Sequence, residues 1–461
     1  MIELSRARVM ALAVGAIVAA AACGGGGGGG GGGETNKGEI IIGSELPTSG
    51  ADASSGLPAQ LGAQFAVTQK GSLKGFKLTF LPFDDAVNGA HDPQKGVQNV
   101  QQMISNTKVL GFVGPFNSSV AKAEIPVANQ VPLAMISPSN TNECLTQSFD
   151  YCQKENGFTP QSLRPSGKNN YFRVAAADTF QGPAMADFAI DNLKDASGAK
   201  VTKFAVWDDE ETFGKGVADN FAKEAQKKGG SVVSRKSYDP KSKADFKDFL
   251  LDAKDKGAQA IYVGGTSATK GCIARAQMKG IFTTDIFYLG PDGIGDKQCI
   301  NDAGDQANGN VYASQGVADA TQNPDAKSIV DSYKKAHPSP NDLAAYTFAS
   351  YDCAAILIDA IGRAIDANNG NMPSRQQVVD QVAKTKNFKA LGGVVTFDKN
   401  GDPTAPALQI QQVKGGDFVF VKQIAAPAAA VQRIIGTSWP GLHLVRVLPD
   451  ARCAVATGTA V

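Results

Sequence analysis

The chain contains few of the residues on which enzyme active sites usually depend. Only three histidines, His91, His337 and His443, occur among its 461 residues. A Ser-His-Asp triad requires a histidine held beside its nucleophile, and no Gly-x-Ser-x-Gly turn is present to display such a nucleophile. The scarcity of histidine and the spacing of the cysteines also argue against a zinc site. We therefore expect a binding protein rather than an enzyme, with no cofactor and no metal.

Two loop motifs that bind phosphate or calcium are also incomplete. The glycine-rich segment 264–271 lacks the Gly-Lys-Ser/Thr ending of a phosphate-binding loop. Residues 398–402, DKNGD, have the spacing that opens a calcium-binding loop, but Pro403 and Gln409 stand where Gly and Glu are needed. A turn between two strands explains this segment better.

The charges show no excess of either sign. The chain has 45 Lys and Arg against 44 Asp and Glu, a formal net charge of +1. Basic residues are interspersed with acidic ones, and no basic patch predicts a nucleic-acid partner. Beyond the amino-terminal segment, no hydrophobic run is long enough to span a membrane.

The amino end has the features of an export signal. Arg6 and Arg8 precede an apolar segment, residues 9–22, which is too short to span a bilayer comfortably. Three alanines then lead to Cys23. Residues 1–23 resemble a bacterial lipoprotein signal, in which Cys23 is lipidated and becomes the first residue, although Ala20 stands at the usual leucine position. An ordinary secretory signal followed by an unrelated cysteine remains the alternative.

Low-complexity segments border the remainder of the chain. Residues 24–33 are all glycine, and we interpret residues 24–36 as a flexible tether. Residues 425–461 are rich in alanine, show no clear periodicity and are expected to form an extension outside the domain fold, without regular structure.

Cysteine usage is compatible with export. Cys144 and Cys152 are eight residues apart in a polar segment and could form a disulfide; Cys272 and Cys299 could form a second. Sequence alone does not establish either pairing. Cys353 lies in an apolar predicted helix and is expected to be a free core thiol.

Between these ends, strands alternate with helices. The expected strands are residues 39–43, 77–83, 109–113, 133–136, 171–174, 203–207, 231–235, 260–263 and 286–289, with closing strands at 394–397, 408–413 and 418–422. The expected helices are residues 57–68, 93–105, 120–130, 181–193, 213–228, 243–256, 268–279 and 343–367. This alternation is typical of parallel sheets with crossover helices, and the chain length favours two such cores.

One turn is a candidate binding site. The buried strand 109–113 ends at Gly114-Pro115, and Asn117, Ser118 and Ser119 stand where the next helix should begin. Helix starts offer free backbone donors to an anion such as a carboxylate. In an open α/β sheet, ligands bind beyond the carboxyl ends of the strands, where this turn would lie. The alternative is that these residues only cap the helix.

Seven segments in order resemble one known family. They are IIIGSELPTSGADASSGLPAQLGAQFAV, VGPFNSSVA, ISPSNTNECLT, YFRVAAADTFQGPAMADFA, AVWDDEETFGKG, the pair YVGGTSATKG and LGPDGIGD, and VVTFDKNGD. Together they are similar to the type I solute-binding proteins of ABC transporters, in the leucine/isoleucine/valine-binding branch. The resemblance covers residues 37–424.

The resemblance implies an α/β fold of two Rossmann-like lobes with parallel sheets, joined by three crossover hinge segments. The implied N-terminal lobe is residues 37–177 plus 316–392, and the implied C-terminal lobe is residues 178–315 plus 393–424. The crossovers would fall near Ala177-Asp178, Gln315-Gly316 and Gly392-Gly393.

The resemblance also implies a site for an amino acid. The ligand carboxylate would meet Ser118, and Asn140 with Thr141 in the loop after the next strand. Ser119, which is next to Ser118 at the expected helix start, is a further ligand-binding candidate. The ligand ammonium would meet an acidic residue at Asp292.

Three positions on the second-lobe side depart from the family pattern. Asp292 stands where amino-acid binders often have Glu. Phe213 and Thr266 occupy positions that are often aromatic, but Phe213 lacks a phenolic hydroxyl and Thr266 has no ring. An amino acid is therefore expected, and leucine, isoleucine or valine in particular is left open.

These features predict an exported, lipid-anchored protein of the periplasm or the outer face of the cytoplasmic membrane. As a monomer, it would capture an amino acid or a similar small polar ligand and deliver it to an ABC permease and ATPase complex. A ligand-sensing receptor that uses the same hinge closure is the alternative, and a secreted hydrolase is disfavoured by the missing catalytic groups.

Overall fold

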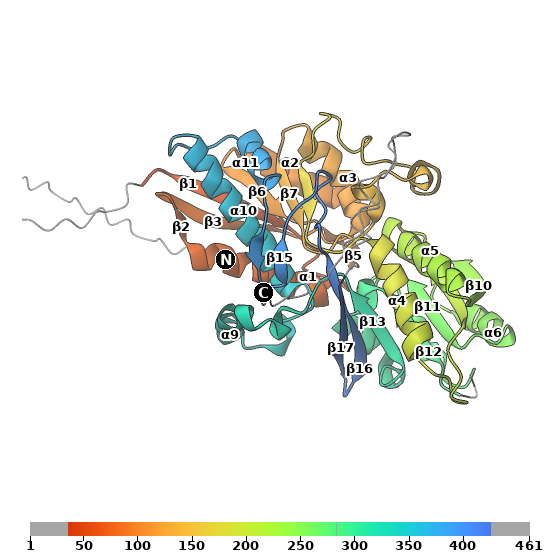
Figure 1. Ribbon diagram of the computed structural model, residues 1–461. Helices are drawn as coiled ribbons and strands as arrows, with labels where there is room; N and C mark the ends of the chain where they lie inside the picture. Colours follow the sequence, from red (N-terminus) through yellow and green to blue (C-terminus); the bar gives the residue numbers. More distant parts are fainter. Residues whose placement is uncertain (1–35, 283, 426–461) are drawn as a thin grey trace, which may run out of the picture. The chain divides into compact units, whose positions relative to one another are not determined.

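The computed structural model describes residues 36–282 and 284–425 (Figure 1). The predicted signal with Cys23, the glycine run, and the extension after Ala425 lie outside these residues. Strands and helices alternate through the described part, and the strands form two large sheets. The α/β prediction is confirmed.

The first sheet has six strands in the order β2-β3-β1-β6-β7-β8. Its strands are β1 (Glu39–Glu45), β2 (Ser72–Leu73), β3 (Phe76–Phe83), β6 (Val109–Val113), β7 (Ala134–Ser137) and β8 (Tyr171–Arg173). All neighbours are parallel except the edge strand β2. A small hairpin of β4 (Ala86–Val87) and β5 (Ala90–His91) follows β3.

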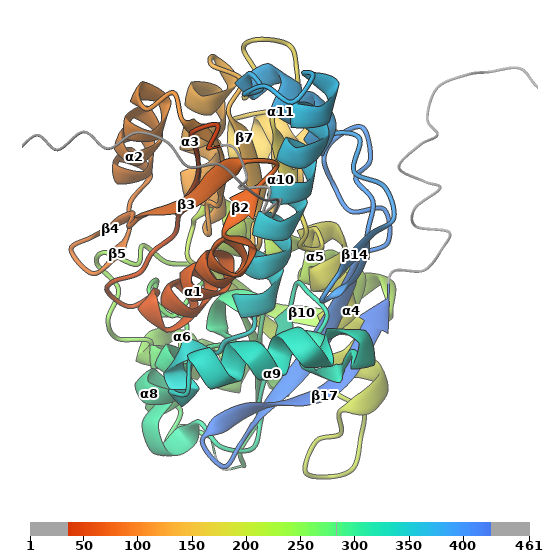
Figure 2. The same cartoon turned by 90° about the vertical axis from the view of Figure 1, so that its left-hand side faces the viewer.

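Helices cover both faces of this sheet, and we call the whole the first lobe. Ile40 and Ile42 belong to the core under α1 (Ala53–Lys70), α10 (Thr347–Ala367) and α11 (Arg375–Val382). Ile41 belongs to the core under α2 (Pro93–Ser105) and α3 (Ser118–Asn129). Successive strand residues point to opposite faces, so a fully apolar strand requires cover on both sides. Figure 2 shows α1 and α10 side by side on one face.

The second sheet has seven strands in the order β10-β9-β11-β12-β13-β16-β17. Its strands are β9 (Lys203–Asp208), β10 (Ser231–Ser237), β11 (Ala260–Gly264), β12 (Phe287–Gly290), β13 (Val311–Gln315), β16 (Ala407–Lys414) and β17 (Asp417–Ala425). The first five are parallel, and β16 and β17 are antiparallel additions.

This sheet with its helices forms the second lobe. Phe204 and Val206 pack toward α4 (Asp178–Asn192) and α5 (Thr212–Lys227). Ala205 and Trp207 pack toward α6 (Lys247–Asp255), α7 (Ile273–Gln277) and α8 (Lys297–Ala303). Figure 1 shows α4 and α5 lying together on one face.

Several predicted boundaries are wrong. Helix α1 begins at Ala53, inside the segment interpreted as a loop. The helix expected over 268–279 is reduced to Ile273–Gln277, because Thr266 and Thr269 bond to each other and form a turn. Strand β13, α8, α11 and α9 (Lys327–Ala336) were not predicted.

The third passage between the lobes lies later than the resemblance implies. Val395 and Phe397 are buried in the first lobe's core, beyond the expected boundary at Gly392-Gly393. Strand β15 (Gly393–Val395) pairs with β14 (Phe388–Ala390) in a separate two-stranded sheet. The predicted closing strand at 394–397 is therefore part of a hairpin on the first lobe, because its apolar side chains pack there.

Both expected disulfides are present, Cys144–Cys152 and Cys272–Cys299. Cys353 is a buried free thiol in α10, as predicted. Among the described residues, no helix combines the length and the apolar character needed to cross a bilayer.

Candidate functional site

The two sheets share a strand arrangement that places loops together. In each sheet the first strand of the lobe, β1 or β9, lies between the second and third parallel strands. The connections that follow neighbouring strands then run over opposite faces of the sheet. The loops at the carboxyl ends of these strands form a crevice. Ser118, Asn140 and Thr141 follow β6 and β7, whereas Phe213, Thr266 and Asp292 follow β9, β11 and β12. The predicted site residues thus come from equivalent ends of both sheets.

Ser118 is the first residue of α3 and is 2% exposed. The residue before it, Asn117, makes no side-chain capping bond. The Ser118 hydroxyl accepts a weak hydrogen bond of 3.4 Å from the backbone N–H of Asn142. The alternative that this turn only caps its helix is therefore not supported by its hydrogen bonds.

A buried arginine shapes the neighbouring loop. Arg173 is fully buried and pairs with Asp402 at 2.7 Å. Its guanidinium also donates to the carbonyl oxygens of Asn140 (3.2 Å) and Asn142 (2.8 Å). Asp402, from the segment that has calcium-loop spacing, is therefore the counterion of Arg173 and holds the loop in place.

Asn140 and Thr141 have different positions in this loop. The Asn140 amide donates to the Phe116 carbonyl at 2.7 Å, and its oxygen accepts from the Tyr171 hydroxyl at 2.9 Å. This side chain is committed to the scaffold. Thr141 is 1% exposed, and its hydroxyl oxygen has no hydrogen-bond partner among the described residues. A buried unpaired hydroxyl is costly, so Thr141 is the stronger candidate for a ligand contact.

Asp292 lies at the start of a short turn after β12, opposite this loop. One carboxylate oxygen accepts from the Gln181 amide at 2.5 Å, and the other accepts from the Tyr346 hydroxyl. Burial, opposed by these two hydrogen bonds, raises the pKa of Asp292 to about 6. Since Tyr346 belongs to the first lobe and Asp292 to the second, this contact joins the lobes.

The side chains around Gly316 converge from both lobes. A Cβ on Gly316 would lie 3.1 Å from Thr141 Cγ2, 3.1 Å from the Tyr346 hydroxyl and 3.2 Å from Gln181 Oε1. A larger residue would fit at this point of the hinge only if these neighbours shifted by a few tenths of an ångström. Thr141, Gln181, Asp292 and Tyr346 therefore form one cluster.

Phe213 and Thr266 lie together beside Asp292. A Cβ on Gly293 would lie 2.8 Å from Phe213 Cε1 and 3.0 Å from Thr266 Cγ2. The Thr266 hydroxyl is engaged by the backbone N–H of Thr269 at 3.1 Å. These two residues form an apolar wall rather than a source of hydrogen bonds.

Ser119 contacts the opposite lobe. Its hydroxyl donates to Glu211 Oε2 at 3.2 Å. Other hydrogen bonds between the lobes are Asn142 to the Thr212 carbonyl (2.8 Å), Asn220 to Glu143 (3.0 Å) and Ser54 to Asp296 (3.1 Å). The structure is a closed form in which the two sets of loops meet.

Asp178 is a candidate that the sequence analysis missed. It is fully buried at the first position of α4, and its backbone N–H donates to the Thr141 carbonyl at 2.7 Å. Neither carboxylate oxygen has a partner in good hydrogen-bond geometry among the described residues, but the Thr141 hydroxyl is close enough to lower the pKa of this carboxyl. Burial, followed by the charges of Glu143 and Asp292, raises the pKa of Asp178 well above its ordinary value. The signal was its place after a strand and at a helix start, the rule that selected Ser118.

Tyr262 adds a further unpaired group. Its side chain is fully buried, and its hydroxyl has no partner in the described part of the chain. The charges of Asp178 and Asp292 act on it. We call Thr141, Asp178, Gln181, Tyr262, Asp292 and Tyr346 the hinge cluster. It combines the buried carboxyl of Asp178 and the partly buried carboxyl of Asp292 with unpaired hydroxyls from both lobes.

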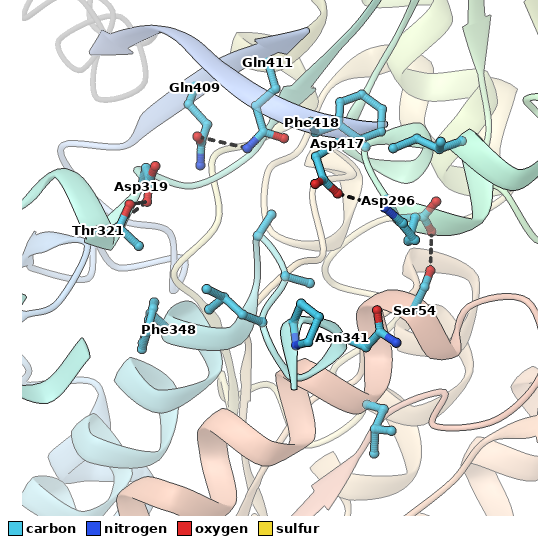
Figure 3. A pocket seen from close by; sticks show the side chains of 18 of the residues that line it. Ser54, Asp296, Asp319, Thr321, Asn341, Phe348, Gln409, Gln411, Asp417 and Phe418 are labelled. Atoms are coloured by element: carbon cyan, nitrogen blue, oxygen red, sulfur yellow. Dashed lines mark hydrogen bonds and ion pairs between the residues drawn. The ribbon is translucent and has the colours of Figure 1, made fainter. Parts of the chain in front are cut away.

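A cavity of about 690 Å³ lies elsewhere between elements of both lobes (Figure 3). Its carboxylates already have partners. Asp296 accepts from Ser54 at 3.1 Å, and Asp417 pairs with Lys297 at 2.8 Å. Volume alone does not make this cavity a better candidate than the hinge cluster. In the described residues, no group of three or more His, Cys, Asp or Glu side chains is arranged to hold a metal ion.

A family model described as "Periplasmic binding protein" matches residues 39–417. The chain belongs to this family. A relative named Leu/Ile/Val-binding protein homolog 3, from Brucella melitensis, is 27% identical over 388 residues, which cover 83% of this chain and 93% of the relative. The family comprises extracytoplasmic solute-binding proteins and is not a class of enzymes.

Solved structures agree with the fold. A leucine-binding protein, LivK of Thermotoga maritima, has a TM-score of 0.69 and 25% identity, covering 84% of this chain and 98% of the other. LivJ of Streptococcus pneumoniae, a branched-chain amino acid transporter substrate-binding protein solved with isoleucine, has a TM-score of 0.69 and 21% identity, covering 84% and 100%. This periplasmic binding protein therefore has the two-lobed architecture that the resemblance implied.

Proposed function

We propose that this protein captures an amino acid, branched-chain or related, between its lobes and delivers it to an ABC import permease. The observation that carries the proposal is the hinge cluster, where unpaired buried oxygens of Thr141, Asp178 and Tyr262 lie with Asp292. Buried polar groups in folded proteins nearly always have partners, so a polar ligand is the natural occupant.

A zwitterion matches the two sides of this site. Its carboxylate would accept from the hydroxyls of Ser118 and Thr141 at the start of α3 and in the following loop. Its ammonium would donate to Asp292, with Asp178 as a second acceptor. Two buried carboxyls close together favour a cationic group between them, because each then gains a counterion that burial otherwise denies it.

This arrangement couples binding to closure. The carboxylate donors lie on the first lobe and the acidic acceptors on the second, so both ends of the ligand are satisfied only when the lobes meet. A ligand that binds the closed form better shifts the equilibrium toward it. A permease that recognises the closed form would then bind only protein that carries a ligand.

The named ligands of relatives support an amino acid with an apolar side chain. The wall of Phe213 and Thr266 is apolar and would contact that side chain. Because Thr266 carries no ring, this wall leaves more room than an aromatic residue would. We therefore expect the preference among leucine, isoleucine, valine and related amino acids to be set here.

A thermal-shift and calorimetry series tests the proposal. L-leucine, L-isoleucine and L-valine are compared with 4-methylpentanoate, which lacks the ammonium, and 3-methylbutylamine, which lacks the carboxylate. We expect at least one zwitterion to raise the melting temperature by mass action and both one-ended analogues to fail. Equal binding of 4-methylpentanoate would contradict the role of Asp292 and Asp178.

We also propose that the protein is held at the membrane through lipid on Cys23, with residues 24–36 as a tether. Mass spectrometry of the mature protein should detect a modified cysteine at its amino end. The Cys23→Ser variant should move from the membrane fraction to the soluble fraction. A wild-type protein that is cleaved elsewhere and recovered in the soluble fraction would refute the anchor.

The partner would be a permease and ATPase complex that receives the ligand from a monomeric binding protein. Uptake of the ligand by cells should require both this protein and that complex. Size-exclusion chromatography with light scattering should give one chain per particle, with and without ligand.

A further inference from the structure

His91 lies between the two lobes and is not part of the hinge cluster. It ends β5, and its side chain is 2% exposed. Its Nδ1 is 2.7 Å from Asp52 Oδ2, on the same lobe just before α1. Its Nε2 is 3.0 Å from Glu211 Oε2, on the other lobe just before α5. Each ring nitrogen therefore faces a carboxylate of a different lobe.

This geometry selects one protonation state. A neutral imidazole has a single N–H, so one of its nitrogens would direct a lone pair at a carboxylate oxygen. An imidazolium has two N–H groups and donates to both. Only the protonated ring satisfies Asp52 and Glu211 together, and charge-assisted hydrogen bonds are the stronger kind.

The surrounding charges agree with this state. Burial opposes protonation of His91, but Asp52 and then Glu211 outweigh it and raise the pKa of His91 well above its ordinary value. Burial opposes ionisation of Glu211, but the hydrogen bond and charge of His91 outweigh it and lower the pKa of Glu211. Ser119 donates to the same Glu211 oxygen at 3.2 Å.

Four further groups act on this contact. One is Asp209, two residues before Glu211, whose pKa is raised to about 7 by burial and then by the charge of Glu211. Asp85, before β4, is fully buried, and burial raises its pKa well above the ordinary value. Lys241 favours the ionised form of Glu211. Asp296, before α8, lies close enough to Asp52 for their charges to interact. Of these groups only Lys241 is a cation, and it follows β10 in the lobe that also carries Glu211.

We propose that His91 is a positioning residue that latches the closed lobes by donating to Asp52 and Glu211 at once, so that the release of ligand is linked to loss of a proton. The inference rests on the proposed capture of a ligand by lobe closure.

The direction of the pH effect follows from linkage. When the lobes open, Glu211 leaves and Asp52 stays, so the pKa of His91 is higher in the closed form than in the open form. The latch stabilises the closed form fully at pH values below the pKa that His91 has in the open form. This stabilisation is lost as the pH rises through the pKa that His91 has in the closed form. On the acid side the latch is lost as the pH falls through the lowered pKa of Glu211.

Two readouts need no ligand. In ¹⁵N-histidine NMR, the chain has three histidines, and comparison with His91→Gln assigns one of them. We expect His91 to be doubly protonated at about pH 7 and its pKa to fall in Glu211→Gln. By small-angle scattering, the unliganded protein should be more open at about pH 9 than at about pH 6.5. A His91 that is neutral at about pH 6.5 would overturn the proposal.

The third readout is the affinity for L-leucine, or for whichever amino acid the thermal-shift series selects. We expect it to fall about threefold to tenfold between about pH 7 and about pH 9 in the wild type. In His91→Gln and Glu211→Gln it should be weaker at about pH 7 and nearly independent of pH over that range. In both variants glutamine is similar in size to the residue that it replaces. It can make only part of the hydrogen-bonded bridge from Asp52 through position 91 to position 211.

Ser54→Ala is the matched control, because it removes the nearby hydrogen bond of Ser54 to Asp296 and no group that titrates. It should weaken affinity equally between about pH 7 and about pH 9, which lies above the pKa of about 6 to which burial raises Asp296, the partner of Ser54. An identical pH dependence in wild type and Glu211→Gln would overturn the latch. If no amino acid binds, the proposed function fails, whereas NMR and scattering still decide the latch.

Discussion

The hinge cluster and the cavity beside Ser54 are both bordered by the two lobes, but their polar groups differ. The cavity encloses about 690 Å³, and its carboxylates are paired with lysine, hydroxyl or backbone groups. The hinge cluster is almost closed to solvent, and oxygens of Thr141, Asp178 and Tyr262 have no partner among the described residues. The cost of an unpaired buried polar group makes the second region the better indicator of a ligand.

The first and largest expected effect is at Asp292. We expect Asp292→Asn to weaken amino-acid binding by about tenfold or more, because it removes the charge that faces the ammonium. Calorimetry measures the affinity, and circular dichroism checks that the variant is folded. Unchanged affinity would leave no reason to prefer the hinge cluster to the cavity as the candidate ligand site.

The second prediction concerns acid pH. Burial raises the pKa of Asp292 to about 6 in the closed form, where Tyr346 of the other lobe donates to it, so below that pH a bound ammonium must displace a proton. Affinity should fall as the pH drops through about 6, by roughly tenfold at about pH 5. Asp292→Asn should lose this dependence. This change of affinity with pH is opposite in sign to that expected from the His91 latch, for which affinity falls as the pH rises from about 7 to about 9.

Third, Asp178→Asn should lower affinity by about threefold to tenfold, because it replaces an ionic acceptor of the ammonium with a neutral one. It should also stabilise the unliganded protein. A raised carboxyl pKa means that stability is fully present below the unfolded-state value and is lost as the pH rises through the folded-state value. The gain in melting temperature should therefore be larger at about pH 8 than at about pH 5. A variant that loses stability at both pH values would contradict this explanation.

Fourth, Ser118→Ala should cost roughly 1 kcal/mol of binding free energy, about fivefold in Kd, for one neutral hydrogen bond, and more for a hydrogen bond to a charged carboxylate. Comparison of the amino acid with its amide tests the assignment. The loss should be smaller for the amide, because its carbonyl carries no charge. An equal loss for both would indicate that Ser118 acts only on the fold.

The smallest effect is expected in the cavity. Asn341 lines it and is exposed. Asn341→Ala should change amino-acid affinity by less than about twofold, since no unpaired buried group depends on it. Calorimetry in parallel with Asp292→Asn gives the contrast directly. A larger loss at Asn341 would move the candidate site to the cavity.

The alternation of apolar strands and amphipathic helices was sufficient to predict two α/β cores, because residues such as Ile40 and Ile41 need cover on opposite faces of a sheet. Local chemistry also predicted the start of α2, where Asp92 caps the helix before Pro93. It failed at residues 268–272, where hydrogen bonds between Thr266 and Thr269 compete with a helix. It also failed at 394–397, where tertiary packing assigns the strand to the other lobe.

The residues of the candidate site also divide into those that the sequence predicted and those that only the structure brought together. Ser118 was predicted from its place after a strand, at the end where open sheets bind ligands, whereas Thr141 and Asp292 were predicted only from the resemblance to the family. Their contact with a ligand stays a prediction. Asp178 had the same local signal as Ser118, its place after a strand and at a helix start. Tyr262 and Tyr346 could not be assigned, because nothing local distinguishes a buried unpaired oxygen from a paired one. His91 is the clearest case: its partners Asp52 and Glu211 are 39 and 120 residues away. Sequence periodicity determined the sheets and the ends of their strands. Which polar groups remain unpaired, and which charges meet across the lobes, depended on tertiary contacts, because only closure brings those distant side chains within hydrogen-bond distance.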